Sequence, residues 1–159
     1  MLITFMQKLE EYLIENNITD SSGIPLSEIE RFEQKLNIQF PRAYKEYAEL
    51  AGKGFRPISA SGLSISLFYL EEYHELAKAN LKEYNVENVI TKDFWVIGEI
   101  YGSLYINFIY LDEGDDPPVY GLDIENYEDD PKEAFGKIAD SFSEYVEQAI
   151  DDYDPRYDR

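Results

Sequence analysis

Residues 27–54 constrain the fold more than any other part of the chain. The stretch reads as two short amphipathic helices, separated by a proline and followed by a glycine turn. Apolar side chains recur on one face of the first helix, at Ile29, Phe32 and Leu36. Ser27 and Glu30 have the spacing of a capping box. We therefore predict that Ser27 caps this helix.

The second helix is predicted to begin at Pro41. Proline fixes its own φ at a value that suits a first helical position, and it pushes Phe40 out of helical geometry. The turn after this helix contains Gly52 and Gly54. The core-facing side of the helix is predicted to carry Tyr44, Tyr47, Ala48 and Ala51.

These motifs together resemble the SUKH superfamily, which is named for fungal cell-wall-synthesis regulators and bacterial immunity proteins. The resemblance rests on the capped helix from Ser27, Ile38-x-Phe-Pro41, Tyr44-x-x-Tyr47 and Gly52-x-Gly54. Val119-Tyr-x-x-Asp123 and the later run from Ala139 to Tyr145 are similar to the closing strand and last helix of the family. The match spans roughly residues 20–150. Many members have Asn-Gly-Gly after the second helix, and this chain keeps two glycines there without the asparagine.

Patterns along the rest of the chain indicate an α+β fold. Helical spacing predicts an N-terminal helix near 3–16, a helix from Glu71 to Tyr84 and a last helix that Ser141 caps, with Glu144 at capping-box spacing. Strands are predicted at Leu63–Tyr69, Phe94–Ile97, Leu104–Leu111 and Pro118–Ile124. Neighbouring strands without crossover helices favour antiparallel pairing. We predict one domain, residues 1–150, in which N-terminal helices and a C-terminal helix pack on a mostly antiparallel sheet, and an acidic tail at 151–159.

The central apolar runs point to a two-sided sheet. Trp95 lies in the densest apolar run and is predicted to be buried. Aromatic residues fall on both alternating faces between Phe94 and Leu111. One face should therefore pack against helices, while the other is at least partly covered or serves as a binding surface.

The composition excludes several classes of site. The chain has 159 residues and no cysteine, so it has no disulfide, no thiolate zinc site and no cysteine nucleophile. It shows no signal sequence and no apolar run of about 20 residues that could span a membrane. We expect a soluble, cytoplasmic protein.

The charge is strongly negative and unevenly distributed. The net charge is -19, and residues 112–159 contribute -13 from 17 acidic and four basic side chains. Such a surface repels nucleic acid and anionic membranes and complements a basic protein. Acidity that serves only solubility is the alternative.

No residue pattern indicates catalysis or a bound cofactor. The single histidine, His74, is expected to be structural or surface-exposed, because no nucleophile motif accompanies it. The acidic run Asp112–Asp116 lacks calcium-loop spacing, so no metal site is predicted. Tyrosines interleaved with acidic residues favour a partner-binding surface, although packing of the sheet would also explain many of them. The predicted binding residues are Tyr101, Asp112, Glu113, Asp115, Asp116, Glu125, Tyr127, Asp129 and Asp130.

Three classes of function are compatible with this sequence. The resemblance implies an immunity protein that binds and neutralises a cognate toxin, for which the acidity suggests a basic nuclease. The same resemblance also allows a regulatory or scaffold module that binds endogenous partners. The third class is a hydrolase, which lacks support because no nucleophile or metal motif is present. We rank the three in this order.

Overall fold

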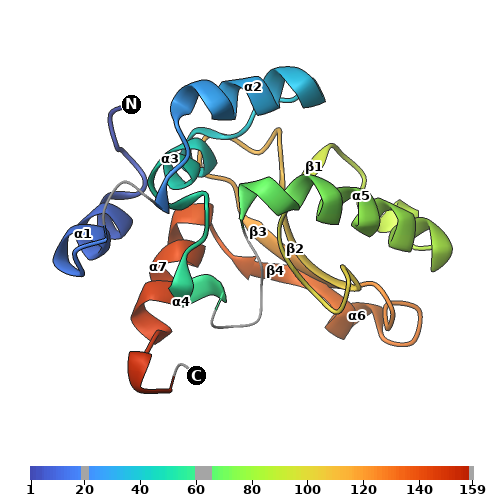
Figure 1. Cartoon of the computed structure of the whole chain (residues 1–159). Helices are drawn as coiled ribbons and strands as arrows, with labels where there is room; N and C mark the ends of the chain where they lie inside the picture. The colour runs from blue at the N-terminus through green and yellow to red at the C-terminus, as the bar shows by residue number, and fades with distance from the viewer. Residues whose placement is uncertain (19–21, 60–65, 158–159) are drawn as a thin grey trace.

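The computed structural model describes residues 1–18, 22–59 and 66–157 and shows an antiparallel sheet with helices on both sides (Figure 1). Its four strands are hydrogen-bonded in the order in which they occur in the chain. They are β1 (Phe94–Ile100), β2 (Tyr105–Tyr110), β3 (Val119–Asp123) and β4 (Phe135–Ala139). The predicted α+β class and the antiparallel pairing are confirmed.

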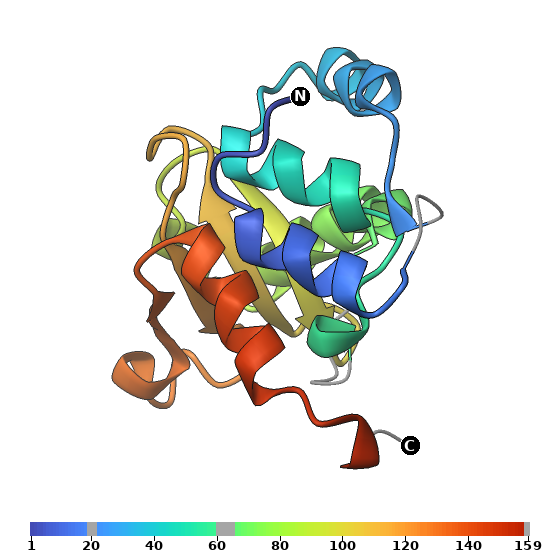
Figure 2. The same ribbon diagram turned by 90° about the vertical axis from the view of Figure 1, so that its left-hand side faces the viewer.

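The helices form two layers around this sheet. Figure 2 shows α1, α3 and α7 in front of the sheet and α5 behind it. The α-helices are α1 (Gln7–Glu15), α2 (Leu26–Leu36), α3 (Arg42–Ala51), α4 (Arg56–Ser59), α5 (Leu67–Glu83), α6 (Pro131–Ala134) and α7 (Phe142–Asp152). Two short 3-10 helices, η2 (Glu87–Val89) and η3 (Pro155–Tyr157), complete the described elements. Helix α7 ends at Asp152, so its last two residues lie in the segment 151–159 that is predicted as the tail.

An aromatic cluster joins the first helical layer to the sheet. The Trp95 indole N–H donates a hydrogen bond of 3.0 Å to the Tyr44 hydroxyl, which links β1 to α3. The Phe40 ring lies 5.0 Å from that of Tyr44 and 5.1 Å from that of Trp95, and the Phe142 ring of α7 lies 5.5 Å from that of Tyr44. Only 1% of Trp95 is exposed, as predicted.

Helix α5 covers the outer edge of β1. The Val96 N–H donates to Nδ1 of His74 over 3.4 Å, and the Asn80 side-chain amide donates to the Gly102 carbonyl over 3.0 Å. An edge strand left open would expose unpaired backbone groups to other chains. These contacts protect that edge and fix the turn after β1.

The predicted N-terminal helix is shorter than expected because Glu46 of α3 holds the residues before it. The Glu46 carboxylate is fully buried and accepts hydrogen bonds from the N–H groups of Thr4, Phe5 and Met6 at 2.7, 2.8 and 3.3 Å. The Arg42 guanidinium also donates to it over 3.1 Å. The backbone of 4–6 is thereby directed to a side chain, and α1 begins at Gln7.

The two helices of the opening motif form, but their starts differ from the prediction. Ser27 does not cap α2; the helix begins at Leu26 with Pro25 in the N-cap position, and the Pro25 carbonyl accepts the Glu28 N–H over 2.9 Å. Pro41 occupies the N-cap of α3, so the helix begins at Arg42, one residue later than predicted. The predicted core side of α3 is confirmed for Tyr44, Tyr47, Ala48 and Ala51.

The predicted strand at Leu63–Tyr69 is wrong where it can be compared. Residues 60–65 lie outside the described part of the chain, and Leu67–Tyr69 belong to α5. The helix starts here because the Ser66 carbonyl accepts the N–H groups of Tyr69 and Leu70. The other predicted strands correspond to β1, β2 and β3, and the Ser141 hydroxyl caps α7 as expected by accepting the Glu144 N–H over 3.1 Å.

Strand β4 was not predicted, and the reason is its mixed pattern. It contains Phe135, Gly136 and Lys137, and its three central residues are exposed. Such a short, weakly apolar run forms a strand because β3 offers its free edge, with Leu122 opposite Phe135. The strand therefore depends on pairing and not on its own hydrophobic pattern.

Two tyrosines on α3 provide a matched test of the aromatic cluster. Both Tyr44 and Tyr47 are 1% exposed, but the Tyr47 hydroxyl has no hydrogen-bond partner among the described residues. Tyr44→Phe leaves the Trp95 indole N–H buried and unpaired, so we expect the free energy of unfolding to fall by about 1–3 kcal/mol. Tyr47→Phe should be neutral or stabilising. Urea denaturation measures both, and equal losses would contradict the role of the Tyr44 hydrogen bond.

Candidate functional site

The predicted binding residues lie at two opposite ends of the sheet. Tyr101 is in the turn between β1 and β2, and residues 125–130 follow β3 at the same end because the strands are antiparallel. Residues 112–116 connect β2 to β3 at the other end. The six residues of β2 separate the two groups by about 20 Å. The structure therefore does not bring all nine residues into one surface.

Two of the four carboxylates between β2 and β3, those of Glu113 and Asp116, are partly buried and hydrogen-bonded within the fold. Asp116 accepts hydrogen bonds from the N–H and the hydroxyl of Ser143 at the start of α7. Asp112 pairs with Lys92 at 3.0 Å, and Glu113 accepts a hydrogen bond of 3.4 Å from the Tyr120 hydroxyl. The Asp115 side chain is exposed, while its carbonyl accepts the Ala43 N–H of α3.

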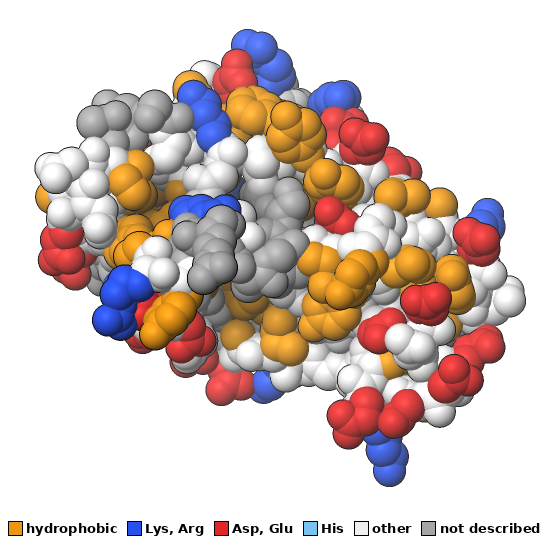
Figure 3. Space-filling model, turned by 60° about the horizontal axis from the view of Figure 1, so that its bottom comes forward, with side chains coloured by type: hydrophobic (Ala, Val, Ile, Leu, Met, Phe, Trp, Pro, Cys, Tyr) orange, Lys and Arg blue, Asp and Glu red, His pale blue; other side chains and the backbone are white. Residues whose placement is uncertain are grey.

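The opposite group is freely presented to solvent, and we call it the hairpin end. It comprises Tyr101, Glu125, Tyr127, Glu128 and Asp129, of which only Tyr127 is half-buried. Between residues 123 and 134 there are six acidic side chains and one lysine, a net charge of -5. Acidic side chains gather on the right of Figure 3, which is the α6 side of Figure 1.

Two acidic residues of this region, Asp130 and Glu128, differ in their surroundings. Asp130 accepts the Glu133 N–H over 3.4 Å and caps α6, so its role is at least partly structural. Glu128 was not among the predicted residues, although it stands in the same acidic run between Tyr127 and Asp129. Its exposure, which the sequence could not show, distinguishes it from Asp116.

Aromatic side chains cover the sheet face turned away from α3 and α7. The Phe108 ring lies 5.7 Å from Phe94, 5.4 Å from Tyr110, 5.6 Å from Tyr120 and 6.3 Å from Phe135. Phe108 is fully buried among them. Tyr110 and Tyr120 therefore pack on this face of the sheet, as the alternative interpretation of the tyrosine content predicts.

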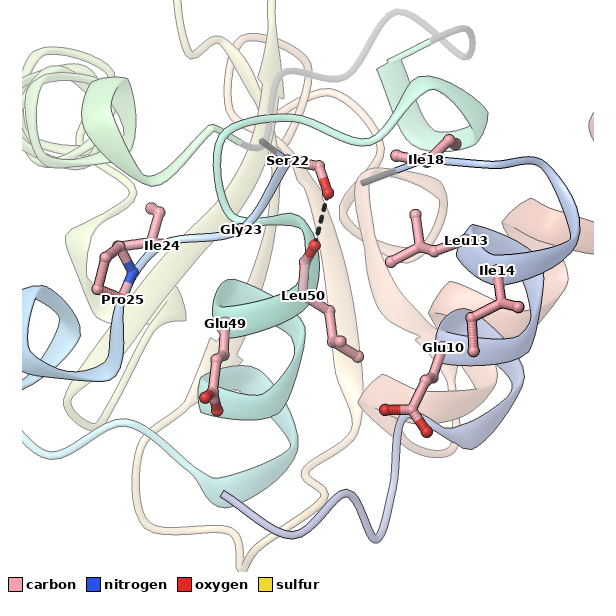
Figure 4. A pocket seen from close by; sticks show the side chains of 10 residues that line it. All are labelled: Glu10, Leu13, Ile14, Ile18, Ser22, Gly23, Ile24, Pro25, Glu49 and Leu50. Atoms are coloured by element: carbon pink, nitrogen blue, oxygen red, sulfur yellow. Dashed lines mark hydrogen bonds between the residues drawn. The ribbon is translucent and has the colours of Figure 1, made fainter. Parts of the chain in front are cut away.

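A shallow groove of about 390 Å³ lies between α1 and the end of α3 (Figure 4). Its lining is mainly aliphatic, from Leu13, Ile14 and Ile24, with the carboxylates of Glu10 and Glu49 at one side. The Ser22 hydroxyl donates to the Leu50 carbonyl over 2.7 Å and joins two segments of the lining (Figure 4). Its lining contains no histidine, cysteine or lysine. The aliphatic part of the groove can accept an apolar side chain.

His74 is part of the core. Its ring lies 4.7 Å from that of Phe94 and 4.9 Å from that of Trp95, and Nδ1 accepts the Val96 N–H. Burial, with a smaller effect from the Lys78 charge, lowers the pKa of His74 to about 4. The imidazole is therefore neutral at pH 7 and serves as a hydrogen-bond acceptor. Within the described ranges, no cluster of three potential metal ligands occurs.

Comparison with known families agrees with the arrangement of these elements. A model of the SMI1 / KNR4 family (SUKH-1) matches residues 23–148, from the segment before α2 into α7. No curated protein matches the sequence. None of the helices in the described residues has the length and apolar character needed to cross a membrane.

The buried His74 predicts a specific pH dependence. Its pKa is lower in the folded chain than the ordinary value of 6.5, so its stabilising effect is complete above pH 6.5 and is lost as the pH falls towards 4. His74→Gln keeps an acceptor without this titration. The difference in unfolding free energy between wild type and variant should shift by up to about 3 kcal/mol between pH 7 and pH 4. Denaturation curves at both pH values measure it; a constant difference would contradict the assignment.

Proposed function

The chain belongs to the SMI1 / KNR4 (SUKH-1) family, and we propose that it is an immunity protein that binds and neutralises a cognate basic toxin domain, plausibly a nuclease. The family is known for immunity proteins and related regulators and is generally non-catalytic. Binding of a protein partner is therefore the function that the family supports, and the toxin is the more specific part of the proposal.

The observation that carries this proposal is the exposed acidic hairpin end. Glu125, Glu128 and Asp129 are exposed, and Lys132 is the one basic side chain between residues 123 and 134. A cationic cleft that binds nucleic acid is the electrostatic complement of such a surface. Concentrated negative charge accelerates encounter with that cleft and disfavours nucleic acid or anionic lipid as the partner.

The remaining candidate sites support binding over catalysis. His74 is neutral, buried and engaged with the backbone of β1. The described lining of the groove beside α1 contains two carboxylates and the Ser22 hydroxyl, which donates to the Leu50 carbonyl, but no histidine or lysine that could act as its base. Because His74 lies in the core and accepts a backbone N–H, it is not placed to exchange a proton with a bound substrate. His74→Gln should accordingly leave partner binding intact.

Charge reversal at the hairpin end tests the proposal. The product of the neighbouring gene is the candidate partner to test, and Glu128→Lys with Asp129→Lys should reduce its association rate by about tenfold at low salt. The difference should shrink as salt screens charges over a Debye length of about 8–10 Å. Stopped-flow or biosensor kinetics at two salt concentrations measure both effects.

The matched control is Glu11→Lys with Glu15→Lys on α1, which changes the net charge equally at exposed positions on the opposite side of the molecule (Figure 1). It should alter the association rate much less. Equal rates for both double variants would remove the hairpin end as the binding surface. Binding of a non-toxin neighbour product instead would favour the regulatory module.

A further inference from the structure

Tyr101 has a backbone conformation that tyrosine rarely adopts. Its φ is 56°, and the next two residues, Gly102 and Ser103, have φ values of 64° and 62°. Positive φ brings the Cβ of an L-residue too close to its own backbone, so a bulky side chain is disfavoured there. Glycine or asparagine would occupy this position with less strain.

The chain uses asparagine where it needs only this backbone geometry. Asn17, Asn37 and Asn85, which follow α1, α2 and α5, have φ values of 55°, 53° and 58°. Asparagine tolerates this region better than other residues with side chains. Among the described residues with positive φ, Tyr101 alone is aromatic. The positive φ that the turn needs therefore does not explain why a tyrosine occupies position 101.

Intramolecular packing does not explain it either. Tyr101 is 79% exposed, and it forms no side-chain hydrogen bond or ring contact with the described residues. The turn is instead held from below by its neighbours. The Ser103 N–H donates to the Glu99 carboxylate over 2.8 Å, and the Ser103 hydroxyl donates to the Tyr73 carbonyl of α5 over 3.2 Å. With the bond from Asn80 to Gly102, these contacts fix a rigid platform under an exposed ring.

The platform lies beside the acidic run. The Ile124 N–H donates to the Leu104 carbonyl over 2.8 Å, so Glu125 follows directly at the base of the same turn. An exposed aromatic ring whose backbone is already fixed loses little entropy on binding. Such rings, when surrounded by polar side chains, are typical anchors of protein interfaces.

We propose that Tyr101 is the anchor of the toxin interface, a pre-positioned ring that enters an apolar pocket rimmed by lysine and arginine on the basic partner. This inference rests on the proposed function and adds the residue that determines how long the complex lasts. The carboxylates of the hairpin end set the association rate, and the Tyr101 ring sets the dissociation rate.

Tyr101→Asn tests the proposal because it predicts opposite effects on stability and binding. Relief of backbone strain should raise Tm by about 2 °C. Loss of the ring should weaken binding to the candidate toxin, the product of the neighbouring gene, by at least about tenfold, mainly through faster dissociation. A residue with a purely structural role would lose stability and affinity together.

Tyr157→Asn is the matched control, because Tyr157 is also 79% exposed but lies in η3 near the C-terminal end of the described chain, with no positive φ. It should change neither Tm nor dissociation. Tyr101→Phe should retain most of the affinity, since the ring and not the hydroxyl enters the pocket.

The outcomes separate this inference from the proposed function. If wild type binds the toxin domain and Tyr101→Asn binds it equally tightly, the anchor is refuted while the immunity function stands. If wild type does not bind, the toxin proposal and the anchor fall together. A lower Tm for Tyr101→Asn would overturn the strain argument, because the tyrosine would then stabilise the turn.

Discussion

The packing of α3 and α7 on the sheet depends on the hydrogen bond between the Trp95 indole and the Tyr44 hydroxyl. The bond joins the first strand to α3 inside a cluster that includes Phe40 before α3 and Phe142 of α7. Burying a tyrosine hydroxyl and an indole N–H is favourable only when each is paired, and here they pair with each other. This bond fixes the height of α3 over the sheet, and α7 then packs against both.

A sheet fixed in this way exposes its two ends to solvent, whereas the outer edge of β1 is covered. Helix α5 occupies the outer edge of β1 through His74 and Asn80, and aromatic rings fill the face away from α3. The strand ends remain available, and antiparallel order places the β1–β2 turn next to the segment after β3. The carboxylates of the hairpin end and the ring of Tyr101 are therefore exposed side by side on a rigid base.

In the proposed complex, this arrangement would separate two physical contributions to binding. Long-range attraction acts before contact and would depend on exposed charge such as Glu128 and Asp129, whereas residence time would depend on groups buried only after contact, such as the Tyr101 ring. At the other end of the sheet, the Asp116 carboxylate is bound to Ser143 and so contributes to the fold. The acidic side chains thus fall into two structurally distinct groups, which composition alone does not separate.

The sequence by itself determined the features that local chemistry controls: the proline between α2 and α3, the apolar strands β1 to β3, the burial of Trp95 and the serine cap of α7. It also identified Tyr101, Glu125 and Asp129 as binding candidates. Tertiary structure alone decided where α1 starts, because Glu46 binds its preceding residues from about 40 positions away. It likewise decided that β4 exists and that the nine predicted binding residues form two groups. Periodicity reports which side of an element is apolar, whereas the pairing of distant strands determines which exposed side chains become neighbours.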